Sequence, residues 1–219
     1  MNEALVVRPF PPLKRGLIAI LRGVKPDEAL DVAGVLIEAG FEAIEVPLNS
    51  PEPLRSIERV SSRYAAQALI GAGTVLQPDE IDDVAHAGGR LIISPNTDPQ
   101  VLERASSLQL VSMPGVLTPT EAHLALRCGA SGLKFFPAMV LGPEGISAIR
   151  AILPADTLIG AVGGVGAESL RAYWQVGVRI FGIGSSLYKP GDHIAIIKKK
   201  ADILVKTYDA LAGDCVKNE

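Results

Sequence analysis

Cysteine is scarce in this chain, and neither acidic nor basic residues dominate it. The only two cysteines of the 219 residues, Cys128 and Cys215, form no CxxC motif, which argues against a disulfide-stapled secreted scaffold and favours a reducing cytoplasm. The 21 basic and 24 acidic residues give a formal net charge of −3. We therefore find no electrostatic reason to expect nucleic acid or an anionic membrane as a partner.

Long apolar runs are also missing. No stretch approaches the roughly 18–20 residues that cross a bilayer, and residues 1–16 contain an acid, three prolines and no signal-peptide core. We therefore expect a cytoplasmic protein. Hydrophobic residues nevertheless make up 48% of the chain, enough for a sizeable core, and this excludes disordered and collagen-like chains.

Short apolar runs recur along the whole chain, with starts 19–26 residues apart. They are nearly continuous rather than alternating, which is typical of parallel strands covered on both faces. The spacing leaves room for one helix between successive strands. The runs are LIAIL (17–21), AIEVPL (43–48), ALIGAG (68–73), LIISP (91–95), LVSMPG (110–115), GLKFFP (132–137), LIGAVGG (158–164) and RIFGIGS (179–185).

Helix-boundary residues separate these runs. Proline or a small polar residue followed by acids predicts helices over 26–37, 78–88 and 118–129. Glycine steps at 39–40, 88–89, 128–130 and 176–177 each precede a strand and indicate helix ends.

Eight strand–helix units without a break in composition predict a single (β/α)8 barrel over residues 1–219. It has an N-terminal extension over 1–16 and a last helix over about 193–212, whose Lys198-Lys199-Lys200 run we interpret as a solvated face. A doubly wound open sheet is the main alternative. The count of eight and the lack of GxGxxG after the first strand favour the barrel.

Two charged residues lie inside predicted strands, where a desolvated ion is costly. Glu45 shares a side of its strand with Pro47 and Asn49, and Lys134 shares a side with Phe136. An unpaired lysine in apolar surroundings has a lowered pKa, and its neutral amine can attack a carbonyl to form a Schiff base. A glutamate across the barrel would then be a proton shuttle.

Position near the active end of the barrel favours this catalytic interpretation over a structural ion pair between the two residues. Arg22 follows the first strand directly, at the mouth where an anionic substrate would arrive. We expect Phe136 to pack beside the imine and exclude water, the alternative being a plain core residue.

Glycines end the seventh and eighth strands, where barrel enzymes often bind phosphate through backbone N–H groups. Gly163, Gly164 and Gly184 permit close approach because they lack a Cβ. Ser185 and Ser186 add hydroxyl donors. These glycines could serve tight turns alone, but their pairing at both strands favours a phosphate site.

Seven motifs resemble, in the same order, those of the 2-keto-3-deoxy-6-phosphogluconate/phosphogalactonate aldolases, over roughly residues 17–190. IGAGTVL and LKFFPA together are highly specific. The motifs are LIAILRG (17–23), EVPLNSP (45–51), IGAGTVL (70–76), ISPN (93–96), MPG (113–115), LKFFPA (133–138) and VGGV (162–165).

The resemblance implies a class I aldolase of carbohydrate metabolism, usually a homotrimeric (β/α)8 barrel, with no cofactor or metal. Such an enzyme reversibly cleaves a 2-keto-3-deoxy-6-phospho sugar acid to pyruvate and glyceraldehyde 3-phosphate. Lys134 matches the Schiff-base lysine and Glu45 the acid/base. Arg22 and Thr74 match positions near the carboxylate and keto end. The phosphate region is matched by Gly163, Gly164, Gly184, Ser185 and Ser186.

Departures from the phosphogluconate pattern point to the phosphogalactonate branch. The phosphogluconate enzymes carry a TLRT-like stretch after the glutamate and a threonine before the Gly-Gly pair. This chain has PLNS at 47–50 and Val162 instead. Because the arginine of that stretch is lost, Arg22 becomes the expected anion partner. The two substrates differ only at C4, so the gluconate epimer stays an alternative.

Other functions fit the sequence less well. The three histidines, at 86, 123 and 193, fall in predicted helices, where a solvated or capping role suits them better than metal binding. A sugar-phosphate epimerase or isomerase would use the same phosphate grip without a lysine imine. A non-catalytic sugar-phosphate sensor would not need Glu45 and Lys134.

Overall fold

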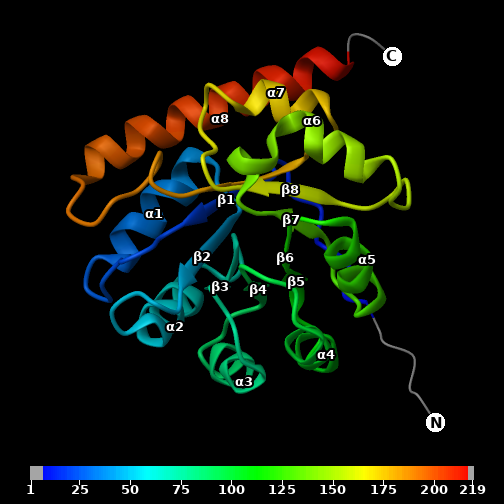
Figure 1. The fold of residues 1–219 in the computed structure, drawn as a ribbon. Helices are drawn as coiled ribbons and strands as arrows, with labels where there is room; N and C mark the ends of the chain where they lie inside the picture. Colours follow the sequence, from blue (N-terminus) through cyan, green and yellow to red (C-terminus); the bar gives the residue numbers. More distant parts are fainter. Residues whose placement is uncertain (1–6, 217–219) are drawn as a thin grey trace.

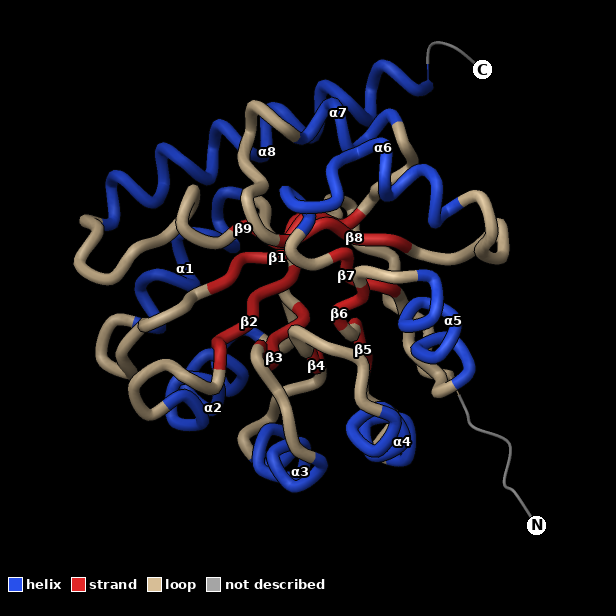
Figure 2. Tube along the Cα trace, viewed as in Figure 1, coloured by secondary structure: helices blue, strands red, loops and turns tan. Residues whose placement is uncertain are grey.

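Residues 7–216 are described by the computed structural model, in which a cylindrical sheet is surrounded by helices (Figure 1, Figure 2). The strands are β1 (Leu17–Ile20), β2 (Ala43–Pro47), β3 (Leu69–Gly73), β4 (Leu91–Ile93), β5 (Val111–Met113), β6 (Gly115–Val116), β7 (Leu133–Phe135), β8 (Ile159–Val162) and β9 (Ile180–Ile183). The helices are α1 (Ala29–Ala39), α2 (Pro53–Tyr64), α3 (Pro78–His86), α4 (Pro99–Ser107), α5 (Pro119–Arg127), α6 (Ala138–Arg150), α7 (Leu170–Gln175) and α8 (Ile194–Val216).

All strand pairs are parallel, in the order β5-β4-β3-β2-β1-β9-β8-β7-β6. Segments β5 and β6 are two halves of one barrel strand, separated by Pro114, which has no N–H to donate. The Pro114 carbonyl still accepts from Lys134 N–H at 3.0 Å, and the Ser112 carbonyl accepts from Ser131 N–H at 2.9 Å. These bonds join the two ends of the sheet, so the predicted (β/α)8 barrel is confirmed.

Four helices end at or just before the glycine steps that were predicted to mark helix ends. Gly40, Gly88, Gly129 and Gly177 all have left-handed φ angles, of 109°, 84°, 82° and 93°, which side chains with a Cβ disfavour. The first predicted helix begins later than expected, because residues 26–28 form turns before α1. The last helix, α8, runs to Val216 rather than ending near 212.

Apolar side chains from β1, β2, β4, β5 and β9 pack together inside the barrel. Phe10 and Leu13, from the chain before β1, pack against this inner cluster. The predicted N-terminal extension thus closes one end of the barrel with its described part; residues 1–6 lie outside the described residues. The open end for a site is therefore the C-terminal one. The inner cluster consists of Ile18, Ala43, Leu91, Ile93, Val111, Met113 and Ile180.

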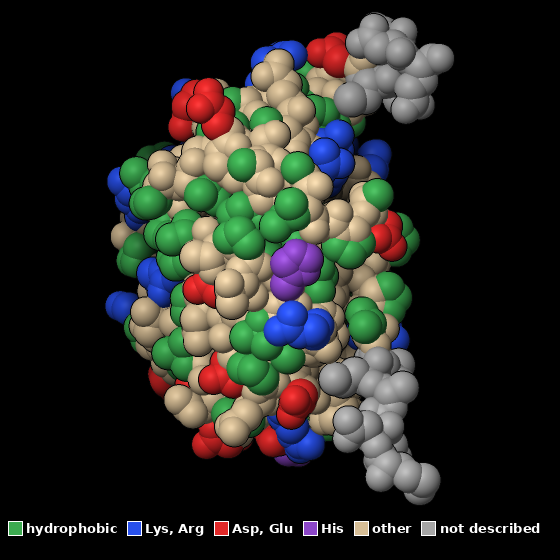
Figure 3. Space-filling model, turned by 45° about the vertical axis from the view of Figure 1, so that its right-hand side comes forward, with side chains coloured by type: hydrophobic (Ala, Val, Ile, Leu, Met, Phe, Trp, Pro, Cys, Tyr) green, Lys and Arg blue, Asp and Glu red, His purple; other side chains and the backbone are tan. Residues whose placement is uncertain are grey.

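The outer surface carries mixed charge. On the face drawn in Figure 3, acidic and basic side chains are interspersed among apolar and neutral ones. Within residues 7–216, no helix combines the length and apolar character that spanning a membrane requires.

Candidate active site

Glu45 on β2 and Lys134 on β7 are both buried in the barrel, with 4% and 6% of their surface exposed. Glycines lie beside them in the sheet register. Gly71 is the β3 partner of Glu45, and Gly115 and Gly160 are the partners of Lys134 on the two strands that flank it. A Cβ on Gly71 or Gly115 would meet the backbone of a neighbouring strand or loop, and one on Gly160 would meet Met113 and Ile180, so these glycines allow the close packing around the two charged residues.

The carboxylate of Glu45 fills a space that Gly73 leaves open. A Cβ on Gly73 would lie 1.2 Å from Glu45 Oε2, which no real structure tolerates. Gly73 ends β3, on the strand next to Glu45. The glycine is therefore required for the observed position of the carboxylate. The sequence analysis did not assign it to the site, although it stands within the IGAGTVL motif.

Burial shifts the pKa values of both groups toward neutrality. It raises the pKa of Glu45 to about 7, against the opposing effect of the positive charges on Lys134 and Arg22. It lowers the pKa of Lys134 to about 8; the charge of Glu45 opposes this shift and that of Arg22 reinforces it. A substantial fraction of the amine is therefore neutral near pH 8.

The two groups do not form a close ion pair. No nitrogen–oxygen contact within 4.0 Å joins Lys134 to Glu45 in the described part of the chain, and Glu45 Oε2 accepts no hydrogen bond there. An unpaired buried carboxylate oxygen is costly, and native proteins retain such groups mainly where they are used. This arrangement speaks against the structural ion pair as the reason for the two charges.

Phe136 lies where the sequence analysis placed it, next to the lysine. Lys134 Nζ lies 4.7 Å from the centroid of the Phe136 ring, within the range of a cation–π contact. The half-buried ring also contacts the β8 loop, because a Cβ on Gly163 would lie 3.4 Å from it. The ring thus lies near both the Lys134 amine and the candidate phosphate loop.

Arg22 lies at the barrel mouth and joins the ends of three strands. Its guanidinium donates to Asn49 Oδ1 at 2.5 Å and to Thr74 Oγ1 at 3.3 Å. Thr74 has a left-handed φ of 58°, which is rare for a β-branched residue and is found mostly at functional sites. Asn49 was not among the predicted site residues. The sequence did carry one signal for Asn49, because period-two alternation places it on the same side of the chain as Glu45.

The loops after β8 and β9 are neighbours, because Val162 pairs with Gly182. Gly163 and Gly164 have left-handed φ angles of 92° and 75°. Several main-chain N–H groups in these loops donate no hydrogen bond to any other described residue. Free donors of this kind at adjacent strand ends are chemically suited to an anion. They include those of Gly164, Val165, Ser185 and Ser186.

The two serines of the β9 loop differ. Ser185 is exposed at the start of a turn in which Leu187 and Tyr188 N–H both donate to the Gly184 carbonyl. The Ser186 hydroxyl instead donates to the Val165 carbonyl at 2.8 Å. The expected Ser186 hydroxyl donor therefore bridges the two loops in this structure.

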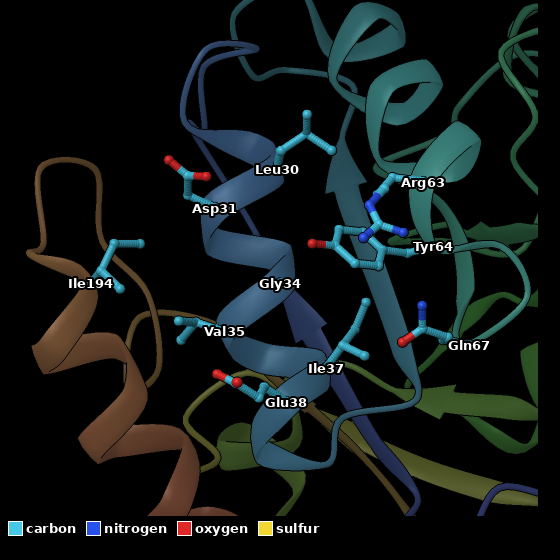
Figure 4. Close-up of a pocket in the computed structure, with 10 residues that line it drawn as sticks. All are labelled: Leu30, Asp31, Gly34, Val35, Ile37, Glu38, Arg63, Tyr64, Gln67 and Ile194. Atoms are coloured by element: carbon cyan, nitrogen blue, oxygen red, sulfur yellow. The ribbon is translucent and has the colours of Figure 1, made fainter.

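A groove of about 850 Å³ lies elsewhere, between α1, α2 and the start of α8 (Figure 4). Asp31 and Glu38 line it on α1, and Arg63 and Tyr64 on α2. It lies outside the barrel and contains none of the predicted site residues, so it does not extend the cluster at the strand ends.

The three histidines stay away from the strand-end cluster. His86 is in α3 and His123 in α5, and His193 Nδ1 accepts from Ala195 N–H at 3.2 Å, as a cap of α8. In residues 7–216, no three His, Cys, Asp or Glu side chains gather in a metal-ligand arrangement.

Known proteins resemble this chain in sequence and in structure. The family model for KDPG and KHG aldolase matches residues 13–204. The probable 2-dehydro-3-deoxy-6-phosphogalactonate aldolase of Rhizobium meliloti (strain 1021) is 55% identical over 205 residues, 94% of this chain and 97% of that protein. The 2-dehydro-3-deoxy-6-phosphogalactonate aldolase of Escherichia coli (strain K12) is 45% identical over 195 residues, 89% of this chain and 95% of that protein.

A solved structure described as "Native KDPGal structure" has a TM-score of 0.91 and 43% identity, covering 94% of this chain and 99% of that one. The chain therefore belongs to the KDPG and KHG aldolase family. It is an aldolase, a carbon–carbon lyase on a (β/α)8 barrel.

Replacing Glu45 by glutamine should lower the pKa of Lys134 below about 8, because the negative charge of Glu45 opposes the lowering of that pKa by burial. The neutral amine then persists to lower pH. The pH dependence of acetylation of Lys134, followed by peptide mass spectrometry, measures this shift. Glu58→Gln, an exposed change on α2, is the control. A Lys134 pKa that stays the same or rises in Glu45→Gln would contradict the described electrostatics.

Proposed function

We propose that this protein cleaves 2-dehydro-3-deoxy-6-phosphogalactonate reversibly to pyruvate and glyceraldehyde 3-phosphate, through a Schiff base on Lys134. The observation that carries the proposal is the buried Lys134 amine, which faces the barrel interior with a lowered pKa and, among the described residues, no carboxylate within 4.0 Å. The names of the two relatives above support the substrate.

Schiff-base formation begins with the neutral amine of Lys134. The amine adds to the C2 ketone, and Glu45 transfers protons during carbinolamine formation and loss of water. With a pKa of about 7, Glu45 can both accept and donate a proton near neutral pH. The resulting protonated imine withdraws electrons from C3.

Cleavage follows when Glu45 removes the proton of the C4 hydroxyl, directly or through a water. The electrons of the C3–C4 bond move into the imine and leave an enamine, while C4 departs as the aldehyde of glyceraldehyde 3-phosphate. The enamine is protonated at C3, and water hydrolyses the imine to pyruvate and free Lys134. This route divides one difficult step into easier ones. Phe136 limits access of water to the imine.

The two ends of the substrate bind to different parts of the barrel mouth. Arg22, supported by Asn49 and Thr74, provides the cation for the carboxylate end. The free N–H groups of the β8 and β9 loops, with Gly163, Gly164, Gly184 and the exposed Ser185 hydroxyl, hold the phosphate. Ser186 contributes its N–H, since its hydroxyl bridges the loops.

The assembly we propose is a homotrimer, and the compartment is the cytoplasm. Family resemblance and two exposed apolar residues support the trimer: Met139 and Val140, 68% and 71% exposed in the protomer at the start of α6. Such exposure suits burial by another subunit. The scarcity of cysteine supports a reducing compartment.

Treatment with borohydride and pyruvate should reduce the imine and leave a stable adduct, visible in the intact mass of the wild-type protein. The adduct should disappear in Lys134→Ala and persist in Lys198→Ala, which changes an exposed lysine on α8. An unmodified wild-type protein would rule out the Schiff base. An epimerase, isomerase or sensor would give this negative result.

Cleavage rates on the two C4 epimers test which of them is the substrate. We expect kcat/KM to be about tenfold or more higher for the phosphogalactonate than for the phosphogluconate, since a difference of about 1.4 kcal/mol suffices. Release of pyruvate, coupled to its reduction, measures both rates. A preference for the gluconate epimer would refute the branch assignment and leave the aldolase chemistry intact.

A further inference from the structure

A partly buried hydrogen bond joins the loop after β9 to the loop after β1. Tyr188 is 3% exposed, and its hydroxyl donates to Glu28 Oε1 at 3.0 Å. Glu28 directly precedes α1. Figure 1 shows the segment between β9 and α8, in orange, passing beside the blue start of α1. The bond therefore connects the loop that carries Arg22 with the loop that carries Ser185.

Each partner of this bond is itself fixed to its own loop. Glu28 Oε1 also accepts from Lys25 N–H at 3.0 Å, which holds the turn ahead of α1. Tyr188 N–H donates to the Gly184 carbonyl at 3.0 Å, within the turn that presents the free N–H groups. A continuous chain of hydrogen bonds thus runs from Lys25 through Glu28 and Tyr188 to Gly184.

A close packing contact adds to this connection. Gly23, the neighbour of Arg22, has a φ of 82°, and a Cβ on it would lie 2.8 Å from Pro190 Cγ. The ring of Pro190 therefore rests almost directly on the backbone of the β1 loop. Gly23 N–H also donates to Ser50 Oγ at 2.9 Å. The β1 loop is thereby held between the loops of β2 and β9.

We propose that Tyr188 is a positioning residue that, through Glu28, sets the separation between the two anion-binding ends of the active site. This inference rests on the proposed function, in which the Arg22 end takes the carboxylate and the Ser185 end takes the phosphate. A substrate with an anion at each end needs both loops at one matching distance. Pyruvate, with a single anion, does not.

The donor of this connection keeps its proton in the pH range of an assay. Burial, and then the hydrogen bond to Glu28, raise the pKa of the Tyr188 hydroxyl, so it remains a donor.

Tyr188→Phe tests the proposal because it removes the donor and keeps the ring. We expect KM for the phosphorylated substrate to rise about fivefold to tenfold, within what a hydrogen bond to a charged group contributes, with kcat little changed. KM for the same sugar acid without its phosphate should stay near the wild-type value. The rate of borohydride trapping with pyruvate should also stay unchanged.

Matched variants separate positioning from a general loss of packing. Tyr208→Phe is the control: this buried tyrosine donates to the Arg179 carbonyl just before β9, at the other end of the barrel. Glu28→Ala should reproduce the defect of Tyr188→Phe. Glu28→Gln, whose amide oxygen can still accept from the hydroxyl, should restore the KM.

Three outcomes overturn the inference. They are a Tyr188→Phe enzyme that matches Tyr208→Phe, a KM increase of equal size for both forms of the sugar acid, and a Glu28→Ala enzyme with the wild-type KM. The last variant also decides the matter if Tyr188→Phe fails to fold. A wild-type protein that cleaves neither sugar acid overturns the proposed function, and the positioning role with it.

Discussion

Burial of one amine and one carboxylate inside the barrel, without direct pairing, is the constraint on which the rest of the structure depends. Desolvation is unfavourable for both ions, so it moves the pKa of Lys134 down to about 8 and that of Glu45 up to about 7. Gly73 on the neighbouring strand β3 provides the space for the carboxylate, since a Cβ there would lie 1.2 Å from Glu45 Oε2. An apolar plug at the opposite end of the barrel leaves the strand ends as the route of entry.

The mouth of the barrel surrounds this pair with two groups that we propose as anion receptors. One is a side-chain cation, Arg22, directed by Asn49 and Thr74. The other is a main-chain surface on the loops of β8 and β9, which needs glycine for close approach. The proposed imine on Lys134, between these two proposed receptors, would suit a substrate with a ketone near one charged end and a phosphate at the other.

Much of this could be predicted from the sequence, because strands and helix ends depend on local chemistry. Apolar runs and glycine steps predicted the barrel, and charge within a strand is rare enough to single out Glu45 and Lys134. Contacts between distant residues had no such local signal. The Glu45–Gly73 contact, the Arg22–Asn49 bond and the Ser186–Val165 bridge depend on the distances between strands. The split at Pro114 also depends on how the sheet closes.

Gly73→Ala is the most direct test that the placement of the Glu45 carboxylate, and not only its presence, makes Lys134 reactive. The substitution keeps both residues but puts a methyl group where Glu45 Oε2 lies. Gly213→Ala, in open space on α8, is the control. The rate of imine formation with pyruvate should fall about 10²-fold in a folded Gly73→Ala protein, the scale of a lost acid–base catalyst. A rate equal to that of the wild-type protein would contradict the account.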